Sequence, residues 1–256
     1  MLAPDRLARF ARHIVLPEMG GAGQVALAGA HVVLVGCGGI GAPALQYLAA
    51  AGIGRLTLID DDSVEASNLQ RQTIFGQADI GAAKAEAAAR WVARFDPALA
   101  VAAHCERIGP GNAAALVAGA SVVLDGCDNF ATRLAVSDAC VAAGVPLVSA
   151  AVGRFSGQVA AFAGHLPGQA CYRCFVGDAF DAADCDSCAA DGVLGAFVGM
   201  VGAMGAMAAI RVVLAGAGVA GPLADPQWGR VQLVDGLAPS LRAITIPADP
   251  ACRACG

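Results

Sequence analysis

The segment GCGGIG, Gly36 to Gly41, has the spacing G-x-G-x-x-G that brings a backbone close to phosphate groups. It follows the apolar run HVVLV and precedes a segment with helical character, which is the context this motif needs. The helix N-terminus offers unpaired N–H groups to an anion. Asp60 ends the next apolar run, RLTLID, where a carboxylate would accept hydrogen bonds from ribose hydroxyls. The pattern predicts a nucleotide and leaves NAD and ATP open.

Positively charged residues downstream favour a triphosphate over a dinucleotide. Arg71 follows Asn68 by three residues, so one helical turn would present both side chains on one face. Lys84 lies near the start of a predicted helix, where the helix dipole disfavours a cation and a phosphate would explain it. The alternative is an ordinary surface lysine. The four histidines and two tyrosines offer no evident proton donor for hydride transfer.

An acidic residue follows the fourth predicted strand. Ligands of doubly wound sheets bind outside the carboxyl ends of the strands, where Asp128 joins the glycine loop and Asp60. A carboxylate beside a triphosphate is a candidate magnesium ligand. Asp61 and Asp125 compete for that role, and a solvated loop acid is the alternative for Asp128.

The cysteines indicate a metal site. Two C-x-x-C turns supply the four thiolates that a structural zinc requires, provided that the C-terminus folds back onto CYRC; free thiols or a redox pair are the alternatives. A third pair, CDSC, exceeds what one zinc needs, so one or both of its thiols are candidate nucleophiles. The three pairs are CYRC (Cys171, Cys174), CDSC (Cys185, Cys188) and CRAC (Cys252, Cys255).

The remaining cysteines lie in apolar surroundings and are predicted to be small buried hydrophobic residues. They are Cys37, Cys105, Cys127 and Cys140.

These residues are positioned by alternating strands and helices, which predict an α/β fold with a Rossmann-like, doubly wound sheet. After Gly153 the alternation stops, which predicts a mixed or antiparallel second half with a cysteine-rich loop at 165–191. Strands are expected at 31–35, 55–60, 99–108, 121–126, 145–153, 157–163, 230–236 and 241–246, and helices at 39–52, 82–95, 112–119 and 129–144.

Composition excludes some classes of function. The net charge is −5 and no basic run occurs, so nucleic acid is not an expected partner. The uncharged run Val193–Ile210 is long enough to span a bilayer, but half of it is glycine and alanine and no basic cluster flanks it, so we expect a buried helix and no membrane association. The charged start of the chain lacks a signal peptide's apolar core, which predicts a cytoplasmic protein.

The motifs GCGGIG, LIDDDSVEASNLQRQ, GCDN, CYRC and CRACG together resemble the ThiF/MoeB/HesA family of adenylyltransferases, the bacterial relatives of ubiquitin-activating enzymes. The resemblance spans nearly the whole chain, from RFARHIVL to CRACG. It implies one ThiF-like domain at 1–256, with a helical arm at 1–29, a nucleotide-binding half at 30–153 and a carrier-binding and zinc-binding half at 154–256.

The resemblance also implies an activity. Such enzymes use ATP and magnesium to adenylate the C-terminal glycine of a small ubiquitin-like sulfur-carrier protein ending in Gly-Gly, for thiamine or molybdenum cofactor biosynthesis. The details lie slightly closer to ThiF than to MoeB. A HesA-like or peptide-modifying enzyme is the closest alternative, and an NAD(P)-dependent oxidoreductase with a structural zinc is an alternative of another class. No sulfurtransferase domain is recognised after Cys255, so a separate sulfur donor is expected.

Site roles follow from the same resemblance. Asp60 would hold the ribose, and Asn68, Arg71 and Lys84 the phosphates. Arg12 would reach the site of a partner subunit in a homodimer, and Cys188 would match a cysteine implicated in thioester or persulfide chemistry. The expected catalytic residues are Arg12, Arg71, Lys84, Asp128 and Cys188; the ATP-binding residues are Gly36, Gly38, Gly39, Gly41, Asp60, Asp62, Asn68, Arg71, Gln72, Lys84 and Asp128; the zinc ligands are Cys171, Cys174, Cys252 and Cys255; and Asp128 is the magnesium ligand.

The sequence departs from the family pattern at three places. Phe10 replaces the usual tyrosine beside the arm arginine, and Cys127 replaces the threonine of the usual CTDN motif. Cys185 is an additional thiol, which weakens an assignment of covalent chemistry to Cys188 alone.

Overall fold

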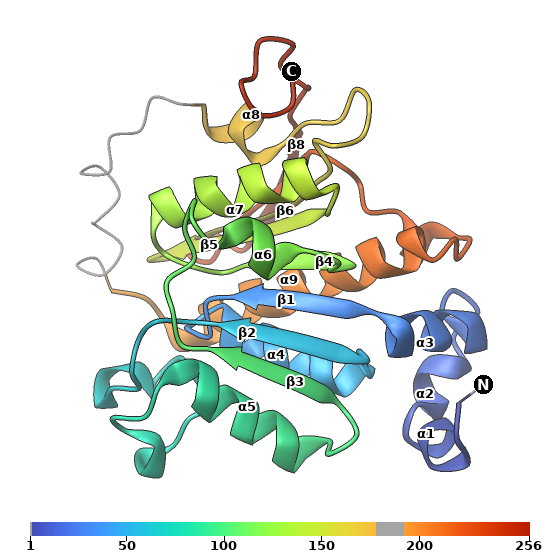
Figure 1. The fold of residues 1–256 in the computed structure, drawn as a ribbon, viewed down its shortest axis with the longest axis vertical. Helices are drawn as coiled ribbons and strands as arrows, with labels where there is room; N and C mark the ends of the chain where they lie inside the picture. The colour runs from blue at the N-terminus through green and yellow to red at the C-terminus, as the bar shows by residue number, and fades with distance from the viewer. Residues whose placement is uncertain (1, 178–191) are drawn as a thin grey trace.

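One eight-stranded sheet forms the centre of the protein, with the order β3-β2-β1-β4-β5-β6-β7-β8 (Figure 1). This computed structural model describes residues 2–177 and 192–256. Strands β1 to β5 are parallel and β6 to β8 are antiparallel, as the sequence predicts. The strands are β1 (His31–Val35), β2 (Arg55–Ile59), β3 (Ala100–His104), β4 (Val122–Asp125), β5 (Leu147–Gly153), β6 (Ser156–Phe162), β7 (Arg230–Asp235) and β8 (Ser240–Thr245).

Helices cover both faces of the sheet, which explains why its central strands are continuous apolar runs. Val32 and Leu34 of β1 share a core with α3, α4, α5 and α9, whereas Val33 and Val35 pack on the opposite face with α6, α7 and α8. The helices are α1 (Pro4–Arg9), α2 (Ala11–Ile14), α3 (Gly20–Gly29), α4 (Gly41–Ala51), α5 (Lys84–Phe95), α6 (Ala113–Val117), α7 (Phe130–Ala143), α8 (Tyr172–Val176) and α9 (Gly195–Gly216), with 3-10 turns η1 (Ala66–Asn68), η2 (Gln77–Asp79) and η4 (Pro222–Ala224).

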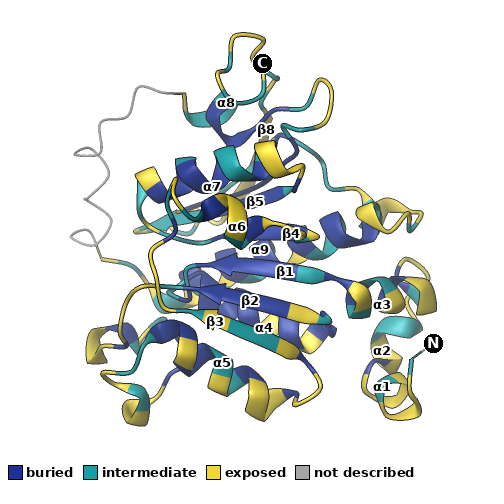
Figure 2. Cartoon of the chain, viewed as in Figure 1, coloured by how far each residue is buried: buried dark blue, intermediate teal, exposed yellow. Residues whose placement is uncertain are grey.

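The long apolar helix α9 packs on the sheet and on α4 (Figure 2). By length and composition it is the one helix of the described residues that could cross a membrane, and 56% of its most apolar window is buried. Its glycines permit close packing: a Cβ on Gly202 would lie 2.5 Å from Cγ of Pro43. The helix therefore belongs to the protein core, as predicted.

The N-terminal arm, α1 to α3, lies at the end of the sheet where the strands begin (Figure 1). Phe10 is 2% exposed and packs against Gly52, which ends α4 with φ of +83°. Arg6 donates to the buried carboxylate of Asp96 at 2.6 Å. Arg12 is exposed. The arm is helical as predicted, but it is divided into short helices.

The segment predicted as a loop at 165–191 contains the one-turn helix α8, which is a correction to the sequence prediction. This helix begins directly after Cys171 and includes Cys174, so the first C-x-x-C turn is helical. Residues 178–191 lie outside the described part of the chain.

Candidate functional site

A cleft of about 690 Å³ lies at the carboxyl ends of the central parallel strands. It brings together most of the residues predicted from the sequence, although they come from separate loops. The cleft is lined by Gly36, Gly38, Gly39, Asp60, Asp62, Asn68, Arg71, Gln72, Lys84 and Asp128. Its volume is in the range typical of sites for small ligands.

The glycine loop between β1 and α4 needs its glycines for different reasons. Gly36 has φ of +84°, a conformation that L side chains rarely adopt. A Cβ on Gly41 would collide with the carbonyl oxygen of Gly36, so Gly41 shapes the turn although it does not line the cleft. A Cβ on Gly38 would meet only the Gln72 side chain, at 3.6 Å. A ligand lying against the backbone gives a reason for glycine at position 38.

Asp60 follows β2 and is fixed by the backbone around it. Its Oδ2 accepts a hydrogen bond from the Cys37 N–H at 2.7 Å, and its Oδ1 accepts one from the Asp62 N–H at 2.9 Å. Burial raises the pKa of Asp60, while these two hydrogen bonds and Lys84 act in the opposite direction. The carboxylate is therefore held in one orientation at the cleft wall, suitable for accepting further hydrogen bonds from hydroxyl groups.

Lys84 is buried, so the surface-lysine alternative is wrong. It is the first residue of α5, and its side chain is 8% exposed. Its Nζ lies 2.7 Å from Oδ2 of Asp62, whose side chain is 62% exposed. The pairing compensates for the unfavourable helix dipole at this position and directs a cation into the cleft.

Arg71 and Asn68 are presented by the turn that contains η1. The Arg71 N–H donates to the Asn68 carbonyl oxygen at 3.0 Å, which places both residues on the cleft wall as predicted. The Asn68 side chain is buried and its Oδ1 accepts from the Glu65 N–H at 3.2 Å. The Arg71 guanidinium donates to the Ser67 carbonyl oxygen at 3.1 Å.

The three candidate acids for magnesium differ in their surroundings. Asp128 is exposed at the cleft and makes no hydrogen bond or ion pair with the described residues. Asp125 is 1% exposed and accepts a hydrogen bond from the Cys127 N–H at 3.0 Å. Asp61 pairs with Arg107 at 2.8 Å. Geometry therefore favours Asp128 over its two competitors.

Two cleft-lining arginines were missed by the sequence prediction. Arg107 follows β3, and its guanidinium pairs with Asp61, which raises the pKa of Arg107. The rule that selected Asp60, namely a charged residue after a parallel strand, could have found Arg107. Arg133 lies in the first turns of α7 and is 6% exposed. No feature of its sequence surroundings shows that it is buried.

The four predicted zinc ligands gather at the opposite side of α7 from the sheet centre, near the C-terminus (Figure 1). The Sγ of Cys171 lies 3.6 Å from that of Cys252 and 3.9 Å from that of Cys174, and Cys174 and Cys255 are 3.4 Å apart. A tetrahedral zinc with bonds of about 2.3 Å places sulfurs roughly 3.8 Å apart. The geometry fits a Cys₄ metal centre, and the predicted return of the C-terminus is confirmed.

The other described cysteines differ in how far they are buried. Cys37 and Cys140 are buried as predicted, Cys127 is partly buried, and burial raises the pKa of all three thiols. Cys105 is exposed, so its prediction as a buried residue is wrong. Cys185 and Cys188, the candidates for covalent chemistry, lie outside the described residues.

Arg12 does not line the cleft, and the arm that carries it lies at the opposite end of the sheet (Figure 1). The cleft opens where the parallel strands end, whereas α1 to α3 precede the start of β1. Within one chain, Arg12 and Asp128 are therefore not brought together.

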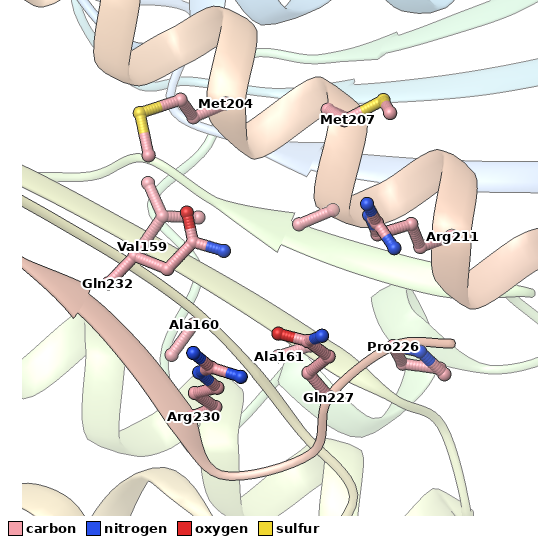
Figure 3. A pocket seen from close by; sticks show the side chains of 11 residues that line it. Val159, Ala160, Ala161, Met204, Met207, Arg211, Pro226, Gln227, Arg230 and Gln232 are labelled. Carbon is pink, nitrogen blue, oxygen red and sulfur yellow. The ribbon is translucent and has the colours of Figure 1, made fainter. Parts of the chain in front are cut away.

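A second, smaller cavity of about 170 Å³ lies between α9 and the antiparallel strands β6 and β7 (Figure 3). Met204 and Arg211 line it from the helix, and Gln232 and Arg230 from β7. Arg211 donates to the carbonyl oxygens of Pro222 and Asp225 at 2.9 and 3.2 Å. None of the residues predicted to bind a ligand lies here.

The ThiF family model matches residues 10–254, which is nearly the whole chain. The chain belongs to the ThiF family. This ThiF-family chain is 40% identical over 257 residues to the sulfur carrier protein adenylyltransferase of Thermus thermophilus, covering 98% of this chain and 92% of that protein. It is 49% identical over 173 residues to the mouse adenylyltransferase and sulfurtransferase MOCS3, covering 68% of this chain but 37% of MOCS3.

Solved structures confirm the ThiF-family fold. Escherichia coli MccB with ATP superimposes with a TM-score of 0.76 at 23% sequence identity, covering 92% of this chain and 69% of MccB. MccB with MccA-N7isoASN gives a TM-score of 0.82 at 22% identity, covering 98% of this chain and 74% of MccB. At this level of identity the likeness concerns the fold alone.

Proposed function

We propose that this ThiF-family protein is an ATP-dependent adenylyltransferase that activates the C-terminal glycine of a ubiquitin-like sulfur-carrier protein. The observation that carries the proposal is the cleft in which Asp60, Arg71, Lys84 and Asp128 converge beside the glycine loop. The T. thermophilus relative, which matches over 98% of this chain, is named for this activity. The four residues supply a ribose acceptor, two phosphate-binding cations and a metal-binding carboxylate.

The chemistry requires positioning and charge compensation. A carboxylate oxygen of the carrier attacks the α-phosphorus of ATP, and the bond to the bridging oxygen breaks, which releases pyrophosphate and leaves an acyl-adenylate. The glycine loop and the N-terminus of α4 present N–H groups to the phosphates. Arg71 and Lys84 stabilise the charge that develops on the phosphate oxygens. No protein nucleophile is needed, which agrees with the absence of an evident histidine base.

Asp128 is proposed as the magnesium ligand because it is the carboxylate of the cleft without a partner among the described residues. Magnesium, when bound, would neutralise phosphate charge in the attack. The four thiols of the cysteine cluster are proposed to hold one structural zinc, since four protein ligands leave no open position for a substrate. Arg12 is proposed to complete the cleft of a second copy of the chain in a homodimer, because it does not line its own cleft.

The test is exchange of labelled pyrophosphate into ATP, measured with purified protein, magnesium and a carrier ending in Gly-Gly. We expect exchange that depends on the carrier and stops when the terminal glycine is removed. Calorimetry with ATP and with NAD is the control for the nucleotide. Tight binding of NAD with no response to ATP would exclude adenylation and favour an oxidoreductase. Exchange supported by an unrelated peptide and not by the carrier would favour a peptide-modifying enzyme.

A further inference from the structure

The turn between β5 and β6 contains an arginine in a backbone conformation that favours glycine. Gly153 pairs with Ser156 across the two strands, which leaves Arg154 and Phe155 as a two-residue hairpin loop. Arg154 has φ of +48°, and it is one of two residues other than glycine with positive φ in the described part of the chain. Two-residue loops with positive φ at the first central position usually have glycine there. The side chain at position 154 therefore strains the turn.

Contacts on both sides of the turn hold it in this conformation. The ring centroid of Phe155 lies 6.4 Å from that of Phe197 on α9. The Phe155 carbonyl oxygen accepts a hydrogen bond at 2.8 Å from the N–H of Gly236, the residue after β7. Strained residues persist where the surrounding contacts determine the backbone, and they are common at binding sites. The fold alone gives no reason for arginine rather than glycine at position 154.

The turn lies at the rim of the cleft. Strand β5 is parallel to β4, so its carboxyl end lies at the edge of the sheet where the cleft opens (Figure 1). Val152 of β5 and Gln158 of β6 line the cleft. Arg154 forms an isolated β-bridge with Val193, which lines the cleft as well. Arg154 itself is exposed and does not line the cleft, so it stands beside the entrance.

The charge of Arg154 is not compensated by the described residues, with which its guanidinium makes no hydrogen bond or ion pair. Two arginines that line the cleft differ in this respect, because Arg107 pairs with Asp61 and Arg133 is buried. The whole chain has a net charge of −5, which repels an acidic partner. An exposed cation at the entrance offsets that repulsion where the partner has to approach.

The wall of the cleft next to the turn suits a peptide better than a phosphate. Its lining residues from β5 and β6 are Ala151, Val152 and Gln158, which carry no charge. Leu194, directly before α9, adds a side chain that is 55% exposed beside Val193. Protein interfaces combine such apolar contacts with charged groups at the rim. An extended chain spans about 3.3–3.6 Å per residue, so a tail whose end reaches the glycine loop meets the rim with residues upstream of its end.

We propose that Arg154 is a carrier-binding residue that pairs with a carboxylate side chain of the carrier, upstream of its terminal glycines. This role rests on the proposed adenylation function, in which the carrier is the substrate. Arg154 directs the tail along the β5–β6 wall toward the phosphates and takes no part in the chemistry. The strained backbone is retained because the arginine contributes to recognition of the carrier.

The test compares Arg154→Gly with Gln227→Gly in carrier-dependent pyrophosphate exchange. Gln227 is the matched control, because it also has positive φ, +53°, and does not line the cleft. Both replacements relieve a strained backbone, so both variants should melt at or above the wild-type temperature. Only Arg154→Gly should raise the carrier concentration for half-maximal exchange, by about tenfold. Its maximal rate and its affinity for magnesium–ATP should equal those of the wild type.

A second comparison isolates the charge. Arg154→Lys keeps the positive charge and should raise the half-maximal carrier concentration by no more than about threefold. The difference between wild type and Arg154→Gly should shrink when the salt concentration rises from about 0.05 to about 0.5 M, because salt screens exposed charges.

A half-maximal carrier concentration in Arg154→Gly equal to that of the wild type would overturn the role of Arg154 and leave the proposed function intact. An equal loss in Gln227→Gly, or a loss that does not respond to salt, would overturn it as well. Weaker binding of magnesium–ATP by Arg154→Gly would place Arg154 at the nucleotide instead. A wild type that shows no exchange at any carrier concentration would refute the proposed function itself.

Discussion

Replacing Lys84 by methionine separates a catalytic role from a structural one. Lys84 is buried, and its Asp62 partner is 62% exposed, so the carboxylate left behind remains solvated. We therefore expect a loss of stability of about 1 kcal/mol, well below the ~3–5 kcal/mol typical of an uncompensated buried charge. That loss corresponds to a fall in melting temperature of roughly 2–4 °C for a chain of this size. The rate of carrier-dependent pyrophosphate exchange should fall by about 10²–10³.

The matched variant is Asp62→Asn, which leaves the buried ammonium group of Lys84 without its ion pair. This change should destabilise the fold more than Lys84→Met does, because the group that loses its partner is the buried one. Thermal unfolding and exchange are measured on the same preparations. Lys84→Met with full exchange activity in the folded fraction would refute a phosphate-binding role. A larger loss of stability for Lys84→Met than for Asp62→Asn would refute the account of the ion pair.

Four further outcomes are expected. Mixing Arg12→Ala and Asp128→Ala chains should restore part of the exchange activity, because one site of each mixed dimer has both groups; no recovery after confirmed subunit exchange would contradict sharing. Cys252→Ser should lose zinc by elemental analysis and unfold at lower temperature, and full zinc retention would point to other ligands. Gly38→Ala should keep the wild-type melting temperature, since only Gln72 lies near the added methyl group. The same variant should bind ATP at least tenfold more weakly by calorimetry, because the methyl group would occupy space beside the backbone where the phosphates are expected to lie. Burial lowers the pKa of His31, so the folded state binds fewer protons than the unfolded state and stability falls as pH drops through about 6.5; urea unfolding of His31→Gln should show a smaller fall.

The division of the sheet into a parallel and an antiparallel half and the position of the cleft could be predicted because both follow from local patterns. Continuous apolar runs alternate with helical segments, which leaves a doubly wound parallel sheet as the arrangement that buries both faces. The carboxyl ends of parallel strands meet at one edge, so Asp60 and Asp128 lie on the same cleft although β3 and α5 separate them in sequence. The four-cysteine cluster could also be predicted from a local pattern, because the C-x-x-C spacing of CYRC and CRAC marks two pairs of metal ligands.

Other features depend on tertiary contacts that no local pattern records. The helix start predicted a phosphate-facing role for Lys84, but its burial and its ion pair with Asp62 of the turn at 60–62 are visible only in the fold. Helix α8 escaped prediction because so short a helix is stabilised by the cluster and by α7 rather than by its own sequence. Asp125 and Asp128 are alike in sequence, and only the fold shows that one is buried beneath the loop and the other exposed.

The charges of the cleft imply that ligand binding exchanges ion pairs. Among the described residues, Lys84 is paired with Asp62 and Arg107 with Asp61, whereas Arg71 has no carboxylate partner. Phosphate oxygens that contact Lys84 compete with the carboxylate of Asp62, and bringing a triphosphate near several acids is unfavourable unless further positive charge accompanies it. A divalent cation held by Asp128, which lines the same cleft, would supply that charge. The same cleft should therefore bind magnesium–ATP more tightly than free ATP, and the difference should shrink when Asp128 is replaced by asparagine.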